Sequence, residues 1–197
     1  AVEEALFAMT ERQEAWTTDE IRSLALERLD ERLARYRLTQ PKQEQQMVQS
    51  IERYGQVSPI VVCLHEEEVV VIDGFKRLRA ARSLQGISSL AARRMDVDEQ
   101  GAKAAIYNLN RIGVRPAELE EAWIVHALVR EDGLSQVEAA QLLGRHKSWV
   151  NRRLAMLERL CAAAREELRL GLLTPALARQ LTRLPRGNQA DALQTAR

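Results

Sequence analysis

The sequence predicts an α+β N-terminal domain, a small mixed sheet with flanking helices, followed by an all-α domain. Two observations predict this division. Apolar β-branched runs alternate with helical patterns up to about residue 112, and beyond it only helical patterns follow, punctuated by Gly and Pro. Aromatic residues are only 4% of the chain, while Leu, Ala and Arg recur throughout, which favours helix. We therefore expect an N-terminal helical extension over residues 1–36, the mixed domain over 37–112 and the helical domain over 113–197.

Caps, breaks and apolar spacing predict the elements in order. A helix over 17–37 follows from Thr18, which can cap it, and from apolar residues along one side. The Gln40-Pro41 break starts a second helix over 42–54, which Gly55 ends. Two β-branched runs then form a hairpin. The expected elements from there on are a strand over 58–64, a turn at 66–68, a strand over 69–73, a helix over 75–85, a weaker strand over 89–96, an Ala-rich helix over 98–110 and, after the break at Arg115-Pro116, a strong helix over 117–130.

Composition and charge narrow the class of protein. A hydrophobic content of 46% suffices for a packed core, and no apolar run approaches the roughly 18 residues of a membrane span. The first 35 residues lack the apolar stretch of a signal peptide, so we expect a cytoplasmic protein in which Cys63 and Cys161 stay reduced. Residues 1–140 carry a charge balance of −6 and residues 141–197 one of +7. This asymmetry favours a polyanionic partner at the C-terminal end, and an ordinary Arg-rich helix surface is the alternative.

The strongest local signal is an apolar strand that ends at Asp73-Gly74 and is followed at once by a cation-rich helix. A helix N-terminus exposes unpaired N–H groups and the positive end of the dipole, and Gly74 permits a tight turn. Lys76, Arg77 and Arg79 add positive charge within about one turn. The pattern favours a phosphate cradle without a Walker motif. A solvated face is the alternative, although Arg77 lies at the edge of an apolar face, where a cation either snorkels or binds an anion.

A second signal covers residues 134–160. Ser135 and Glu138 form a capping box, and Gly144 permits a tight turn after an apolar inward face. The next helix carries Val150, Leu154 and Leu157 as one buried stripe. This is the layout of a helix-turn-helix, whose second helix enters the major groove of DNA. A helical hairpin used only for packing is the alternative.

Polar and basic residues on the free face of that second helix favour DNA. Arg152 and Asn151 suit guanine and adenine edges, whereas Arg145, Lys147 and Arg153 suit phosphates. Trp149 is open to two interpretations, a DNA contact or packing against Arg153. The predicted DNA-binding residues are Ser135, Gln136, Arg145, His146, Lys147, Ser148, Asn151, Arg152 and Arg153.

The order of these pieces resembles the ParB family of partition proteins. Residues 55–62 (Gly-Gln-Val-Ser-Pro-Ile-Val-Val) are similar to the family's first box, and residues 74–80 (Gly-Phe-Lys-Arg-Leu-Arg-Ala) to its Gly-Glu-Arg-Arg-x-Arg-Ala box. Residues 107–111, with Pro116 and the helix after it, are similar to its Glu-Asn-x-Gln-Arg box. The segment 134–160 matches its helix-turn-helix. The resemblance spans about residues 37–193.

The resemblance implies a CTP-dependent DNA clamp in plasmid or chromosome partition or in a mobile element. It implies bacterial, nucleoid-associated localisation, double-stranded DNA and CTP as partners, Mg²⁺ as a candidate companion, self-association through the N-terminal domain and a candidate ParA-type ATPase. The family's C-terminal dimerisation domain has no counterpart, so we expect a truncated or a divergent chain. The implied nucleotide-binding residues are Gly55, Gln56, Ser58, Pro59, Gly74, Phe75, Lys76, Arg77, Arg79, Asn108 and Arg111.

Two departures from the family pattern leave other functions open. Phe75 replaces the Glu of the second box, and Tyr107 replaces the Glu that the third box offers near Mg²⁺. At most weak CTP hydrolysis is therefore expected, with no catalytic residue and no metal ligand assigned. A nucleotide-independent transcriptional or plasmid regulator is one alternative. A ParB-like nuclease or sulfiredoxin-type enzyme is another, although the cradle has no Cys, and Asp73 is its lone carboxylate.

Overall fold

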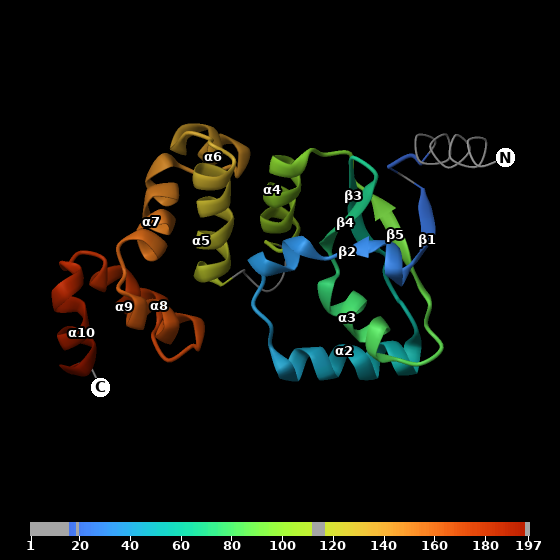
Figure 1. Cartoon of the computed structure of the whole chain (residues 1–197), viewed down its shortest axis with the longest axis horizontal. Helices are drawn as coiled ribbons and strands as arrows, with labels where there is room; N and C mark the ends of the chain where they lie inside the picture. Colours follow the sequence, from blue (N-terminus) through green and yellow to red (C-terminus); the bar gives the residue numbers. More distant parts are fainter. Residues whose placement is uncertain (1–15, 19, 112–116, 196–197) are drawn as a thin grey trace. The chain divides into compact units, whose positions relative to one another are not determined.

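The chain divides into two compact units in the computed structural model, which describes residues 16–18, 20–111 and 117–195 (Figure 1). Of the described residues, the first unit holds those up to Arg35 together with Thr39–Ala102. The second unit holds Tyr36–Leu38 and the described residues from Lys103 onward. The division runs through α4 (Glu99–Leu109), whereas the sequence predicts a boundary at 112–113.

A five-stranded mixed sheet is the core of the first unit, in the order β1-β5-β3-β4-β2. Its central strands β3 and β4 form the predicted antiparallel hairpin, with Glu66 at positive φ in the turn. Strand β5 runs parallel to β3, and β1 runs antiparallel to β5. The side chains of the central strands are buried on both faces, which fits their nearly continuous apolar sequence. The strands are β1 (Ile21–Ala25), β2 (Leu29–Asp30), β3 (Ile60–His65), β4 (Glu68–Asp73) and β5 (Ser89–Arg94).

Two helices cover this sheet in successive layers. Helix α3 (Phe75–Ser83) packs on β3 and β5, and α2 (Pro41–Tyr54) packs on α3, so that α3 lies between the sheet and α2 in Figure 1. Leu78 anchors α3 with a fully buried side chain. Helix α2 begins at Pro41, one residue before the predicted start, and Gly55 ends it as the sequence predicts.

The predicted helix over 17–37 is wrong. The segment instead forms β1, a 3₁₀ turn at Leu26–Arg28, β2 and a second 3₁₀ turn at Arg32–Tyr36. Leu26, Leu29 and Leu33 are buried with the spacing of a helix, but β1 pairs with β5 and β2 pairs in parallel with β4. Pairing with strands distant in sequence thus overrides the local pattern. Residues 20–36 therefore complete the sheet instead of forming a helical extension, and residues 1–15 lie outside the described part.

The second unit is helical, as predicted. The expected helix over 117–130 is α5 followed by a π-helical stretch at Ala127–Glu131, and its expected start at Arg115-Pro116 lies outside the described residues. Helix α5 packs against α7, and the described core joins α5 to the helices that follow. None of the described helices has the length and apolarity that a bilayer crossing needs. The remaining helices are α5 (Glu118–His126), α6 (Gln136–Leu142), α7 (Lys147–Glu158), α8 (Ala162–Arg169), α9 (Pro175–Leu181) and α10 (Arg186–Thr195).

Candidate nucleotide and DNA-binding surfaces

The predicted strand-to-helix turn is present at Gly74. Strand β4 ends at Asp73, and Gly74, with φ +100°, immediately precedes α3. A Cβ atom at this position would lie 2.6 Å from Cγ2 of Ile60, so a side chain has no room. Among the described residues no side chain caps α3, so its first backbone N–H groups remain available to an oxygen ligand.

Arg77 holds the turn together from inside the first unit. Its Nη1 donates to the backbone oxygens of Ser58 (2.8 Å) and Pro59 (2.7 Å) and to Oγ of Ser58 (2.8 Å). Its Nη2 donates to Oδ2 of Asp73 at 2.8 Å, and the side chain is only 17% exposed. In the structure, the charge of Arg77 is therefore neutralised by a carboxylate of the same chain, that of Asp73.

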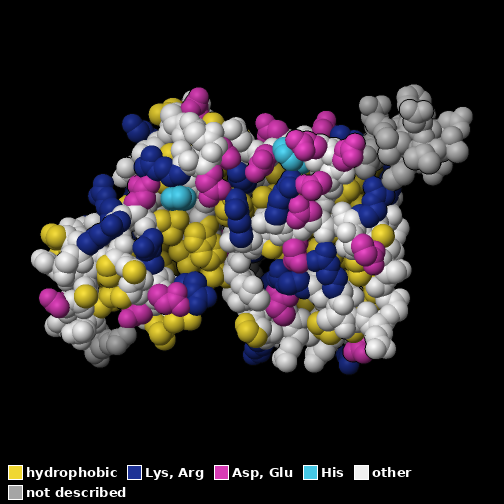
Figure 2. All heavy atoms as spheres, in the orientation of Figure 1, with side chains coloured by type: hydrophobic (Ala, Val, Ile, Leu, Met, Phe, Trp, Pro, Cys, Tyr) yellow, Lys and Arg dark blue, Asp and Glu magenta, His cyan; other side chains and the backbone are white. Residues whose placement is uncertain are grey.

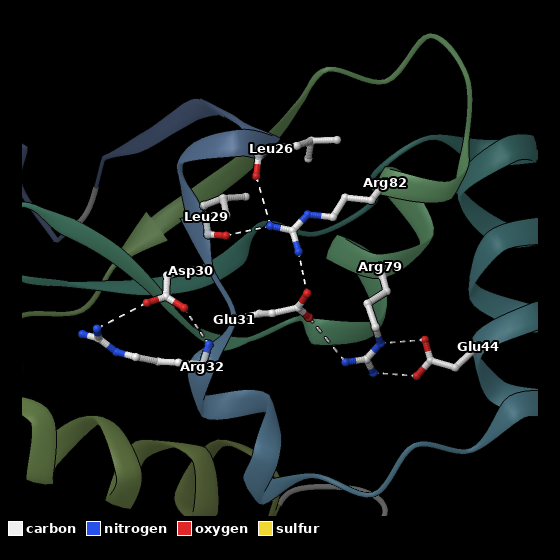
Figure 3. A network of polar contacts seen from close by, with 8 residues as sticks. All are labelled: Leu26, Leu29, Asp30, Glu31, Arg32, Glu44, Arg79 and Arg82. Carbon is white, nitrogen blue, oxygen red and sulfur yellow. Dashed lines mark hydrogen bonds and ion pairs between the residues drawn. The ribbon is translucent and has the colours of Figure 1, made fainter.

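Two further arginines of α3 are also paired with acids, as Figure 3 shows. Arg79 forms a two-point contact with the carboxylate of Glu44 from α2, at 2.7 and 3.2 Å. Arg82 donates to Glu31 at 2.5 Å and to the backbone oxygens of Leu26 and Leu29. These contacts join α3 to α2 and to the segment around β2, so the charges stabilise the packing of this unit.

Lys76 differs from its three neighbours in α3. Its Nζ donates to Oε1 of Gln43, a neutral amide. Within the described part of the chain, no carboxylate compensates its charge, whereas Asp73, Glu44 and Glu31 pair with the arginines. Lys76 is therefore the α3 cation that can meet an added anion without first giving up an acidic partner.

Other predicted nucleotide residues shape the turn. The amide of Gln56 pairs with both backbone groups of Ala91, accepting at 2.6 Å and donating at 2.7 Å, which extends the sheet ahead of β3. Gly55 ends α2 at positive φ. Phe75 is buried in the core, so this ring contributes packing.

Asn108 and Arg111 belong to the second unit. Both side chains are exposed near the end of α4, and the guanidinium of Arg111 lies 5.5 Å from the centroid of the Tyr107 ring. Their predicted role in holding a nucleotide stays a prediction.

The predicted helix-turn-helix is formed by α6 and α7. The Ser135–Glu138 capping box is present, with Oγ of Ser135 accepting from the Glu138 N–H at 3.2 Å and Oε2 of Glu138 accepting from the Ser135 N–H at 2.8 Å. Gly144 has the positive φ that the turn requires, and His146 immediately precedes α7. The predicted apolar stripe is buried at Val150 and Leu154.

The predicted DNA-facing residues mostly lie on the free surface of this motif. Figure 2 shows basic side chains gathered over α7. The exposed members of the predicted set are Ser135, Arg145, His146, Lys147, Ser148, Asn151 and Arg152, and Gln136 is half-buried.

Arg153 departs from its predicted place. Its side chain is only about 10% exposed, and it pairs with Glu121 at 2.6 Å and with Glu118 at 3.1 Å, both from α5. Its guanidinium also lies 5.1 Å from the centroid of the Trp149 ring, which is itself buried. The expectation of a solvent-facing phosphate contact at Arg153 is therefore wrong, and for Trp149 the packing interpretation is the correct one. The sequence signal for this outcome was the acidic pair of α5, three residues apart.

Two family models match the chain in the order of its units. The ParB N-terminal domain matches residues 10–109, and the ParB HTH domain matches residues 117–196. This chain belongs to the ParB family. Its relatives within the family include a nucleoid occlusion protein of Shouchella clausii, 34% identical over 57% of this chain and 39% of the relative. A probable chromosome-partitioning protein ParB of Xylella fastidiosa is 31% identical over 63% of this chain and 40% of the relative.

The chain thus spans about two fifths of the length of these ParB relatives. Its fold is similar to that of the C-terminally truncated ParB from Caulobacter crescentus complexed to the centromeric parS site, with a TM-score of 0.54 and 21% identity. That likeness covers 89% of this chain and 93% of the other. The ParB fold is therefore present across both units.

Tyr107 marks a local departure of this ParB chain from the family's third box. The side chain is fully buried, and its hydroxyl accepts a hydrogen bond from Nε of Arg145 in the α6–α7 turn. This position of the third box therefore carries a buried phenol that contacts the turn of the helix-turn-helix.

Proposed function

We propose that this ParB-family chain is a sequence-specific DNA-binding protein that reads the major groove with α7. The observation that carries the proposal is the division of α7 into two faces, with Val150 and Leu154 buried while Asn151 and Arg152 are exposed. A recognition helix contacts base edges with its N-terminal part, and both residues lie in the first half of α7. Arg and Asn pair best with guanine and adenine edges, so we assign base reading to Arg152 and Asn151.

The neighbouring exposed groups suit the DNA backbone. Lys147 and Ser148 lie in the first turn of α7, and Arg145 lies two residues before the start of this helix. Cationic and hydroxyl side chains at a helix N-terminus fix the register of a protein on DNA through phosphates, without reading sequence. Arg153 is left out of this surface because Glu121 and Glu118 already hold it.

Selection of duplexes from a randomised library tests base reading. The selected duplex should bind at least about a thousandfold more tightly than a mixed-sequence duplex at physiological salt. Arg152→Ala should reduce this ratio about tenfold to a hundredfold, because a bidentate base contact supplies about 1–3 kcal/mol of discrimination. Arg169→Ala is the matched control, since Arg169 is an exposed arginine paired with Glu166. A uniform loss across sequences in Arg152→Ala would assign Arg152 to a phosphate instead.

We further propose that the N-terminus of α3 holds the phosphates of CTP. Three features support this: the uncapped N–H groups of α3, the absence of a side chain at Gly74 and the neutral partner of Lys76. When bound, the triphosphate would supply negative charge that competes with Asp73 and Glu44 for Arg77 and Arg79. Lys76 would bind a phosphate oxygen directly, while Arg77 keeps the 58–59 loop in position.

A companion Mg²⁺ would be held by oxygen ligands, namely one or two carboxylates together with phosphates of the nucleotide. The carboxylate at the turn is Asp73, which is paired with Arg77 in the structure. No cluster of three His, Cys, Asp or Glu suited to a metal occurs among the described residues. We therefore assign no step to a metal.

Titration with labelled CTP tests the role of Lys76. Lys76→Ala should weaken CTP binding about tenfold to a hundredfold, the effect of losing one hydrogen bond to a charged group. Lys42→Ala, which removes an exposed lysine of α2, should leave CTP affinity unchanged. Equal CTP affinity in both variants would contradict the assignment.

A nucleotide-independent regulator is the second candidate function. The observation in its favour is that three α3 arginines already have acidic partners and that Phe75 is buried where the family box carries a glutamate. Sequence-specific DNA binding without binding of any nucleotide would support this second candidate.

The biological setting is proposed from the relatives. We propose a role in chromosome or plasmid partition at the bacterial nucleoid, with self-association through the first unit and a ParA-type ATPase as partner. Light scattering with and without CTP tests self-association, and co-purification with a ParA-type ATPase tests the second association.

A further inference from the structure

Arg145 is held by two aromatic rings in the turn between α6 and α7. Its Nε donates to the hydroxyl of Tyr107. Its guanidinium carbon lies 5.6 Å from the centroid of the Tyr107 ring and 5.3 Å from that of Trp149. The two rings lie 5.5 Å apart and are tilted by 50°. Both rings are buried, while Arg145 itself is exposed, so a rigid apolar support carries a cation at the surface.

The support leaves most of the hydrogen-bonding capacity of Arg145 unused. A guanidinium has five N–H donors, and Tyr107 takes the one on Nε. Within the described part of the chain, the two terminal nitrogens of Arg145 have no hydrogen-bond partner. An arginine already fixed by stacking and by one hydrogen bond loses less rotamer freedom when it binds a phosphate.

The chemistry of Tyr107 also keeps the charge of Arg145 available. The hydroxyl of Tyr107 is a neutral hydrogen-bond acceptor. The Glu of the family's third box, at the same position, would instead place a negative charge beside the guanidinium of Arg145. Arg111 lies over the same ring, so a second cation adds to the positive charge at this point. The surroundings of Tyr107 therefore favour an external anion near Arg145.

We propose that Tyr107 is a positioning residue for DNA binding, which holds Arg145 so that its terminal nitrogens bind a backbone phosphate beside the N-terminus of α7. The proposal rests on the proposed DNA binding and adds to it a residue of α4 that touches no DNA itself. Lys147 and Arg152 are exposed, and no aromatic ring of the described residues supports either of them, so the effect is specific to Arg145.

A salt-dependent binding experiment separates positioning from simple charge. Because a phosphate contact does not depend on sequence, a labelled mixed-sequence duplex serves as the probe, measured by anisotropy at several salt concentrations. Arg145→Ala should lower the slope of log affinity against log salt by about 0.9, the value for one phosphate. Tyr107→Phe keeps the ring and the charge, so it should weaken binding about threefold to tenfold at unchanged slope.

A double-mutant cycle then tests whether the two residues act as one unit. The variant that combines Tyr107→Phe with Arg145→Ala should bind no more weakly than Arg145→Ala alone, since the hydroxyl acts only through the arginine. Arg169→Ala should change neither affinity nor slope. Circular dichroism at the assay temperature checks folding; should Tyr107→Phe not fold, Arg145→Lys, which keeps the charge but loses the Nε donor, should show the same weakened affinity at unchanged slope.

The outcomes distinguish this inference from the function on which it rests. Wild-type affinity in Tyr107→Phe, or additive losses in the combined variant, would overturn the positioning role while leaving DNA binding intact. A wild-type chain that binds no duplex at low salt would overturn the proposed function and this inference with it.

Discussion

Arg153 of α7 donates from Nε to Oε2 of Glu121 in α5 at 2.6 Å, and both side chains are only about 10% exposed. Arg152, its neighbour in sequence, is exposed. Two consecutive arginines of one helix thus have different roles. Arg153 stabilises the packing of α7 on α5, whereas Arg152 is exposed and available to DNA. The pair shows that basic composition alone does not define a nucleic-acid surface.

Removing Arg153 should destabilise the second unit. Arg153→Ala leaves Glu121 buried without its partner, which typically costs about 3–5 kcal/mol. Arg152→Ala should change the free energy of unfolding by less than about 0.5 kcal/mol, as expected for a surface position. Urea unfolding of both variants measures the difference. Similar unfolding midpoints would show that the ion pair with Glu121 contributes little.

Gly74 and Gly86 form a matched pair for testing the strand-to-helix turn. Both have positive φ, but an added Cβ would lie 2.6 Å from Ile60 only at Gly74, whereas at Gly86 nothing lies within 4 Å. Gly74→Ala should therefore lower the free energy of unfolding by at least about 1 kcal/mol more than Gly86→Ala. At Gly86 an alanine meets only the strain of a positive φ, without a steric clash. Thermal unfolding compares the two, and equal losses would mean that the close approach to Ile60 relaxes at no cost.

Replacing Arg77 should affect both stability and the proposed nucleotide site. Arg77→Ala leaves the carbonyl oxygens of Ser58 and Pro59 without this donor and should cost about 1–3 kcal/mol. CTP binding should be lost, and DNA binding by α7 should be largely retained. Ser58→Ala, which removes one acceptor only, is the milder control. Unchanged CTP affinity in a folded Arg77→Ala protein would remove this residue from the proposed site.

Cys63 should contribute a pH-dependent part of the stability. Burial raises the pKa of its thiol above the usual 9.0, although nearby Arg32 opposes this. Because the folded pKa exceeds the unfolded one, the contribution is complete below the unfolded pKa and is lost as pH rises through the folded pKa. The stability advantage of wild type over Cys63→Ala should therefore shrink as the pH rises above the unfolded pKa of a thiol, about 8.5. A constant difference in urea unfolding below and above this pH would show that the thiol does not titrate differently on folding.

Local signals were sufficient for much of the fold. The β3–β4 hairpin, the cap of α6 and the stripe at Val150 and Leu154 were predictable because each depends on residues close in sequence. The segment 20–36 was not, because Leu26, Leu29 and Leu33 are buried at helical spacing while the backbone of the segment pairs with β5 and β4, which follow far later in the chain. Only the tertiary partners decide between helix and strand there.

The candidate site shows the same limit. The cations of α3 could be found from the sequence, but their partners Glu31 and Glu44 lie on separate elements, and nothing local predicts those pairings. Tyr107 could be identified as a departure from the family box, yet its contact with Arg145 depends on the packing of α4 near the turn of the helix-turn-helix. Which cations stabilise the fold and which remain available to a ligand therefore depends on ion pairs between elements that are distant in sequence.

We propose that CTP binding and DNA binding are linked in this chain, as the resemblance to a CTP-dependent DNA clamp implies. Linkage is reciprocal. If CTP changes the affinity of the protein for DNA by some factor, DNA must change the affinity of the protein for CTP by the same factor. The most direct measurement is titration of labelled CTP, ATP and GTP into the protein with and without the selected duplex. We predict that of the three nucleotides only CTP binds, and that the duplex changes the affinity of the protein for CTP at least about fivefold. If none of the three nucleotides binds, or if the duplex leaves the affinity for CTP unchanged, the proposed linkage is contradicted.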